Sequence, residues 1–189
     1  MTLNKINVKI YLEKGQDIPL NTFIPIFHRF IQKDLLEGML VDVAEYTHVH
    51  EGPGVLLIAH EGNYSVDETD GKRGLLYNFK RASSANAEEN MKTAFRRALK
   101  ACELLEKEPE LAGKMKFNPS RLRIFINDRL NTSGKNRGFS ELEESIRPLL
   151  EKLTGSLIKL IPEMDPQKLT AFEVEVEKTL TVQNLIGKV

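Results

Sequence analysis

Three of the four histidines of this 189-residue chain lie within thirteen positions, at His48, His50 and His60. Imidazole rings bind transition metals and exchange protons near neutral pH. Tyr46 and Glu61 lie beside them in the sequence and add further groups that can donate or accept a proton. One hypothesis is therefore an enzyme whose acid/base site lies in this segment.

The geometry of this segment depends on how two predicted strands, residues 39–49 and 54–60, pair with each other. In a strand, His48 and His50 point to the same side. A four-residue EGPG loop places His60 on the opposite face of the sheet, whereas a three-residue GPG loop places all three histidines on one face. The sequence leaves both registers open.

No known metal or cofactor motif occurs in the chain. The string HVHEG lacks the HExxH spacing of metalloproteases, and VDETDGKRG has its acids at the wrong offsets for an EF-hand. The GxGxxG, Walker A and GxSxG motifs are absent too. We therefore predict no metal and no cofactor, and an enzyme is the less favoured class of function.

A second candidate site is the SGKNRG segment, which lies between a predicted strand and a predicted helix. Free backbone N–H groups and the helix dipole favour an anion at such a position. The alternative is a polar loop beside a helix that Ser140 and Glu143 cap. The residues predicted to bind an anionic small molecule are Ser133, Gly134, Lys135, Arg137 and Ser140.

The net charge of zero is unevenly distributed. Residues 1–71 carry a net −6, residues 72–138 a net +9 and residues 139–189 a net −3. One interpretation is that the middle third neutralises the two flanks across internal interfaces. The other is that it forms a basic face that binds an anionic ligand.

Nucleic acid is not an expected partner. The string RGLLYNF, residues 73–79, begins like the RNP1 motif of RNA-binding domains. Leu75 and Leu76 stand where that motif has an aromatic and a small residue.

Period-two and helical patterns predict eight strands and three main helices. The predicted helices lie near residues 22–37, 86–107 and 140–153. The predicted strands are residues 4–12, 39–49, 54–60, 63–68, 74–81, 121–128, 156–162 and 169–182.

Short connections between these strands indicate an α+β fold with a mostly antiparallel sheet. We expect a single domain, residues 1–189, with internal halves at 1–107 and 119–189 that resemble ferredoxin-like βαββ units. Lys5 and Lys9 on the first strand would complement the glutamates of the last strand, so these two strands are expected to pair with each other or with a symmetry mate.

The composition is that of a soluble globular protein. The one cysteine, Cys102, lies on the apolar stripe of the second helix, so we expect it to be buried rather than reactive. With no internal disulfide, no signal peptide and no apolar stretch that could span a bilayer, the expected location is the cytoplasm. Small α+β domains of this kind often form homo-oligomers.

The strings FIPIFHRFIQ, DVAEYTHVHEGPGVLLIAHEGNYSVD and FINDRL resemble an uncharacterised family of bacterial proteins. The resemblance covers most of the chain and implies no activity and no site residues. The sequence thus favours a non-enzymatic binding or assembly module, which recognises an anionic small molecule or a partner.

Overall fold

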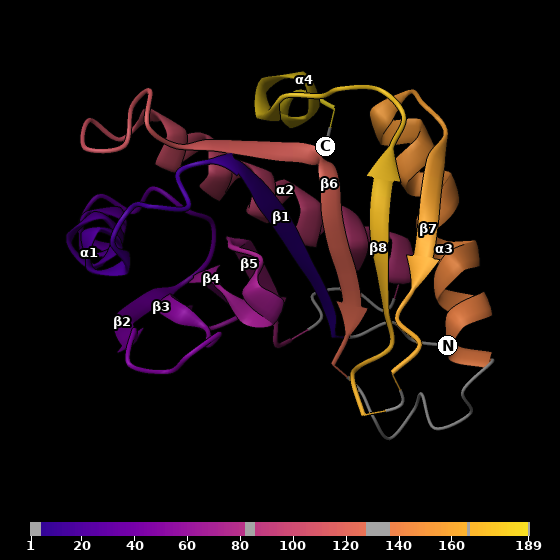
Figure 1. Cartoon of the computed structure of the whole chain (residues 1–189), viewed down its shortest axis with the longest axis horizontal. Helices are drawn as coiled ribbons and strands as arrows, with labels where there is room; N and C mark the ends of the chain where they lie inside the picture. The colour runs from indigo at the N-terminus through magenta and orange to yellow at the C-terminus, as the bar shows by residue number, and fades with distance from the viewer. Residues whose placement is uncertain (1–4, 82–85, 128–136, 166, 189) are drawn as a thin grey trace.

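The computed structural model describes every residue except 1–4, 82–85, 128–136, 166 and 189. One sheet of eight strands, crossed on one side by helices, makes up most of the described chain (Figure 1). The strands are β1 (Ile6–Lys14), β2 (Leu40–Tyr46), β3 (Gly54–Ala59), β4 (Gly62–Asp67), β5 (Gly74–Phe79), β6 (Lys116–Ile126), β7 (Ile158–Pro162) and β8 (Ala171–Val176). The α-helices are α1 (Phe23–Gln32), α2 (Ala87–Lys107), α3 (Arg137–Thr154) and α4 (Val182–Ile186).

The strand order is β2-β3-β4-β5-β1-β6-β8-β7, and every neighbouring pair is antiparallel. This confirms the predicted α+β class and its antiparallel sheet. Because direction alternates from strand to strand, β1 and β2 run parallel, as do β6 and β7. Helices α1 and α3 make these two crossover connections. The ferredoxin-like halves are not confirmed.

Strand β1 is buried on both faces, as suits its position at the centre of the sheet. Ile6, Val8 and Ile10 are fully buried on the face that the helices cover. Helix α2 packs across β1 and β5, and its apolar stripe includes Cys102, which is fully buried. The prediction that Cys102 is buried is therefore confirmed. This burial raises the pKa of the Cys102 thiol.

The expected pairing of the first and last strands is wrong within the chain, because β6 lies between β1 and β8. Lys9 pairs with Asp67 rather than with a glutamate of β8. The hydroxyl of Tyr11 reaches across β6 instead and donates to Glu173 at 2.7 Å. The sequence pattern showed complementary charges but not the strand inserted between them.

Several helix boundaries differ from the predictions for local reasons. Helix α1 ends at Gln32 rather than near residue 37, and Asp34 soon after it has a left-handed φ of 50°. Helix α3 begins at Arg137, so Ser140 lies inside the helix and is not its N-cap. Helix α4 was not predicted; it is a single short turn capped by Thr181.

Ion pairs join the basic middle of the chain to both acidic flanks. Arg96 binds Glu37 at 2.8 Å, and Arg123 approaches Glu163 at 3.3 Å. These contacts support the first interpretation of the charge pattern, internal neutralisation. Among the described residues, no helix has the length and apolar character needed to cross a membrane.

Candidate functional site

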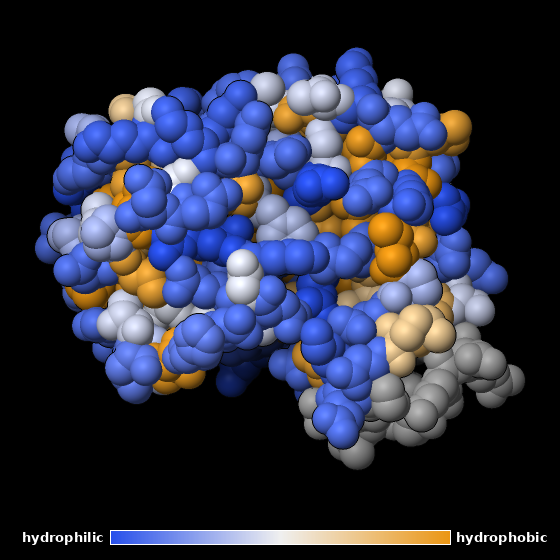
Figure 2. Space-filling view, viewed as in Figure 1, coloured by the Kyte–Doolittle hydropathy of each residue, from blue (hydrophilic) through white to orange (hydrophobic). Residues whose placement is uncertain are grey.

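In the view of Figure 1, strands β1, β6, β8 and β7 lie in front of helices α2 and α3. This front face of the sheet is mostly hydrophilic (Figure 2). A sheet face without helices should be wet, yet several polar side chains there are buried. We call Asn7, Lys9, Asn63, Ser65 and Asp67 the polar strip; four of them are at most 4% exposed, and Asn63 is half-buried.

Strand register brings the polar strip together from segments that are distant in sequence. Asn63 on β4 and Asn7 on β1 are both opposite Asn78 on β5, so the three amides form one row across three strands. Two positions further along the strands, Ser65 and Lys9 are both opposite Leu76.

The two outer asparagines of this row have buried oxygens without a hydrogen-bond donor, Oδ1 of Asn7 and Oδ1 of Asn63. The Asn7 amide cannot be turned to solve this, because its Nδ2 donates to the carbonyls of Lys5 at 3.3 Å and Phe125 at 3.4 Å. Buried polar atoms in native proteins nearly always have a partner. The row therefore contains two buried acceptors that no described group satisfies.

Lys9 and Asp67, by contrast, satisfy each other. The Lys9 ammonium donates to the Asp67 carboxylate and, at 3.1 Å, to the carbonyl of Thr69. Burial lowers the pKa of Lys9, and Asp67 opposes this effect. Gly74 lies between Asp67 and Tyr11 in the sheet and has no side chain, which leaves room for the pair to meet across β5.

An ion-pair network fixes the turn that follows β4. Asp70 has a left-handed φ of 62° in this turn and binds both Arg123 of β6 and Lys168, the latter at 2.9 Å. Strands β4 and β5 pair on either side of this turn. These charges compensate one another, so the neighbourhood of the polar strip carries little free charge.

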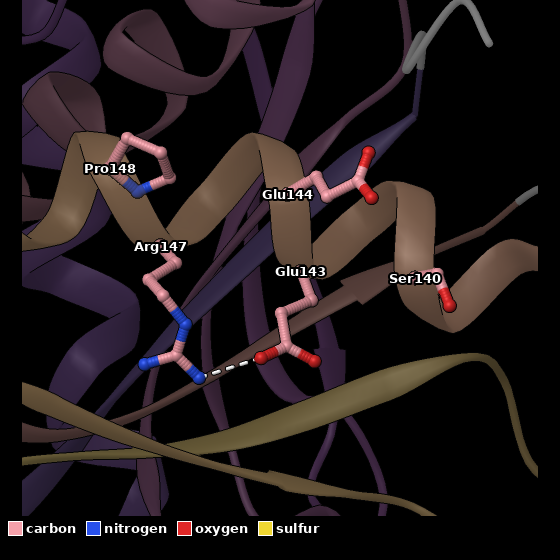
Figure 3. Close-up of a pocket in the computed structure, with 5 residues that line it drawn as sticks. All are labelled: Ser140, Glu143, Glu144, Arg147 and Pro148. Carbon is pink, nitrogen blue, oxygen red and sulfur yellow. Dashed lines mark hydrogen bonds and ion pairs between the residues drawn. The ribbon is translucent and has the colours of Figure 1, made fainter.

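A separate cavity of about 410 Å³ lies against α3 (Figure 3). Its lining residues are Ser140, Glu143, Glu144, Arg147 and Pro148. Arg147 binds Glu143 at 2.6 Å and the carbonyl of Ile158 at 3.0 Å. With two carboxylates and one guanidinium that already has partners, this described lining does not favour an anion.

The predicted anion-binding segment is only partly described. Ser133, Gly134 and Lys135 lie outside the described residues, and Arg137 is described only as the start of α3. Ser140 is exposed and lines the α3 cavity. The anion site at this segment stays a prediction.

The structure does not bring the histidines together. Tyr46 ends β2 and is opposite Gly54, so His48 and His50 lie in the connection between β2 and β3 rather than in a strand. Both registers left open by the sequence are wrong, since the ladder is shifted by several residues. The predicted strand 39–49 was too long, because its alternation of apolar and polar residues continues into the turn after Tyr46.

His60 lies beyond the other end of β3, where its backbone N–H donates to the carbonyl of Met39. Its Nε2 is 2.9 Å from Arg81, and its Nδ1 is 3.9 Å from Glu61. All three clustered histidines are exposed. In the described part of the chain, no group of three or more histidine, cysteine or acidic side chains is placed to hold a metal ion.

The RNP1-like string forms β5, where Tyr77 and Phe79 point into the core and are at most 1% exposed. These rings are therefore not available to stack on bases.

Both edge strands carry features that oppose further strand addition. On either side of β7, Leu157 and Glu163 form backbone hydrogen bonds with the segment of β8. The backbone groups of Ile158 and Pro162, next to them, therefore point away from the sheet. Pro162 has no N–H, and the Ile158 carbonyl accepts from Arg147. On β2, the Val43 N–H donates to the Asp42 carboxylate at 2.8 Å. Such blunting is how natural sheets avoid pairing with other chains.

No protein-family model matches the chain, and neither does any curated protein. The assignment of a site therefore depends on the geometry of the chain itself.

Proposed function

We propose that this protein is a non-enzymatic binding module that takes a small molecule on the polar strip. One observation carries the proposal: on a sheet face that no described α-helix packs against, the half-buried Asn63 and Asn78 lie in one row with Asn7, and Asn7 and Asn63 each keep a buried oxygen without a donor among the described residues. A buried acceptor without a partner costs about 1–3 kcal/mol. Proteins keep such a cost where function requires it.

Catalysis is less well supported at this site. Lys9 and Asp67 are engaged with each other, and no histidine belongs to the polar strip. The alternative acid/base site has Tyr46 and His48 near each other, with ring centroids 6.4 Å apart, but His60 at the far end of β3. No observation favours that alternative.

Assembly by sheet extension is also less well supported, because Pro162 and the bonded groups at Ile158 and Val43 blunt both edges. A homo-oligomer formed in another way, and an anionic ligand at residues 133–138, stay predictions. The half-buried amides of Asn63 and Asn78 argue for a ligand that forms hydrogen bonds.

The test is a nuclear magnetic resonance screen of a fragment library against the full chain, read on the side-chain amide signals. Ligands should perturb the signals of Asn7, Asn63 and Asn78. Replacing Asn63 by leucine should weaken binding about tenfold, the equivalent of about one hydrogen bond. Asn21, which is exposed outside the strip, provides the control variant Asn21→Ala. Ligands that perturb only other surfaces, or that bind Asn63→Leu unchanged, would overturn the proposal.

A further inference from the structure

Exposed apolar side chains lie on the front face of the sheet at the edge strand β7. Leu157, directly before β7, is 64% exposed, and Ile161 within it is 38% exposed. Both point away from the core, whereas Ile158 between them is buried on the side where α3 packs. Hydrophobic atoms gather over β7 and β8 in Figure 2. An exposed apolar group of this kind is typical of a surface that binds another protein.

Two columns of opposite charge run along the strands beside these apolar side chains. Arg121 on β6 is opposite Glu175 on β8, and Glu175 is opposite Lys159 on β7. The side chains of Arg121 and Glu175 are 68% and 42% exposed, and their charged atoms are 3.6 Å apart. A pair this exposed contributes little to the stability of one chain. The two side chains can therefore exchange partners at little cost.

The order of these columns is complementary to that of a second copy of the same chain. A two-fold axis that runs along the strands, between β6 and β8, places β6 of each copy over β8 of the other. Arg121 of each copy then faces Glu175 of the other, because these two residues lie at the same level of the sheet. Sheets that pack face to face keep their strands within about 30° of each other, so the levels stay matched near the axis.

The same axis covers the apolar side chains. It places β7 of each copy over β1 of the other, because β1 is the next strand beyond β6. The front face of β1 carries the half-buried ring of Tyr11, against which Leu157 and Ile161 of the other copy can pack. Strands β4 and β5 stay uncovered, so a ligand at Asn63 and Asn78 does not compete with the second copy.

We infer that the chain forms a symmetric homodimer through the front face of β1, β6, β8 and β7, with or without a ligand. Burial of Leu157 and Ile161 supplies the affinity, and the reciprocal contacts of Arg121 with Glu175 fix the orientation. Four short strands form a small interface, and interfaces below about 1,200 Å² in total are usually weak. We therefore expect a dissociation constant of about 10–100 µM.

Analytical ultracentrifugation of the full chain, from about 5 to about 500 µM, measures this dimer. The double variant Leu157→Lys, Ile161→Lys should weaken it at least about tenfold, because it removes the apolar contact. Met39 is 66% exposed beside β2, at the opposite edge of the sheet, and provides the matched control Met39→Lys, which should dimerise as before. Circular dichroism checks that each variant keeps its fold.

A charge exchange distinguishes a contact between copies from one within a chain. Arg121→Glu places acids face to face across the axis, and Glu175→Arg places bases there, so each variant alone should dimerise at least about tenfold more weakly. An equimolar mixture of the two should form a heterodimer, because each acid then faces a base of the other chain. An unmodified chain that stays monomeric at about 500 µM shows that this face does not bind a second copy. The same conclusion follows if the lysine variant dimerises unchanged, or if the mixture associates no better than its components.

Discussion

Lys9 and Asp67 form an ion pair in which both side chains are at most 4% exposed. The pair spans β1 and β4 across the intervening β5, on the side of the sheet opposite the helix-covered core. Asp67 also accepts from the backbone N–H and the hydroxyl of Thr69, at 3.2 and 2.7 Å. The pair therefore connects β1, β4 and the turn at Thr69 at one buried point.

Breaking this pair from one side should be costly. Lys9→Met leaves the Asp67 charge buried without its partner, and we expect a loss of about 3–5 kcal/mol in the free energy of unfolding. The double variant Lys9→Met, Asp67→Asn removes that charge and should be more stable than Lys9→Met alone. Urea denaturation measures both. The surface pair of Lys92 and Glu88 is the control, since Lys92→Met should leave the free energy of unfolding nearly unchanged. Equal losses for Lys9→Met and the double variant would contradict the prediction.

Asn63→Val should stabilise the free protein by about 1 kcal/mol, because it removes a buried oxygen that has no donor and introduces a residue that favours strands. The melting temperature should rise while ligand binding falls. A melting temperature that is unchanged or lower would show that the Asn63 oxygen has a partner in solution.

Gly62→Ala should destabilise the fold by about 1–3 kcal/mol through overpacking. A Cβ atom at Gly62 would lie 2.5 Å from the Tyr77 hydroxyl and 2.7 Å from the Asn78 carbonyl oxygen. Gly187 has open space around it and provides the matched control, Gly187→Ala. Thermal unfolding of the two variants tests the difference, and similar melting temperatures for both would argue against close packing at Gly62.

Glu103 should make the free energy of unfolding depend on pH in the acid range. Hydrogen bonds from Lys100 and Lys107 lower the pKa of Glu103 from its ordinary value of 4.5 to about 2. Between pH 4.5 and about 2, the unfolded chain therefore binds more protons at Glu103 than the folded chain does. The stabilisation that ionised Glu103 gives the fold is complete above pH 4.5 and is lost as the pH falls toward 2.

Glu103→Gln should reduce the fall in the free energy of unfolding over this pH window, measured by urea denaturation at several pH values. The exposed Glu89 on the same helix gives the control Glu89→Gln. A pH dependence that is the same in Glu103→Gln and in the unmodified protein would rule out this role.

Much of the fold could be predicted because its signals are local. Alternation in segments such as Ile6–Lys14 identifies strands, and the stripe through Met91, Ala94 and Phe95 identifies α2. The order of the strands could not be predicted, because nothing local indicates that β6 pairs with β1 and separates it from β8. The turn lengths that fix register, as around His48 and His50, also depend on contacts beyond the segment.

The polar strip was missed for a related reason. Alternation along β1 places Asn7 and Lys9 on its polar face, and a polar face is ordinarily exposed. Only the pairing of β5 with both β1 and β4 brings Asn63 and Asn78 beside them. A signal was present in the sequence, since Asn63, Asn78 and Asn7 all occupy the non-core positions of apolar strands. The clustering of His48, His50 and His60, by contrast, is visible in the linear sequence.

The central position of β1 has a consequence for synthesis on the ribosome. Its neighbours are β5 and β6, whose residues opposite Lys9 are Leu76 and Arg123. The chain emerges from its amino end, so β1 leaves the ribosome long before either neighbour exists. The meander from β2 to β5 can pair as it appears, whereas β1 must wait, unpaired, for sequence made much later. The middle of the finished sheet is thus completed only after β6 has been made, although β1 is the first strand in the sequence.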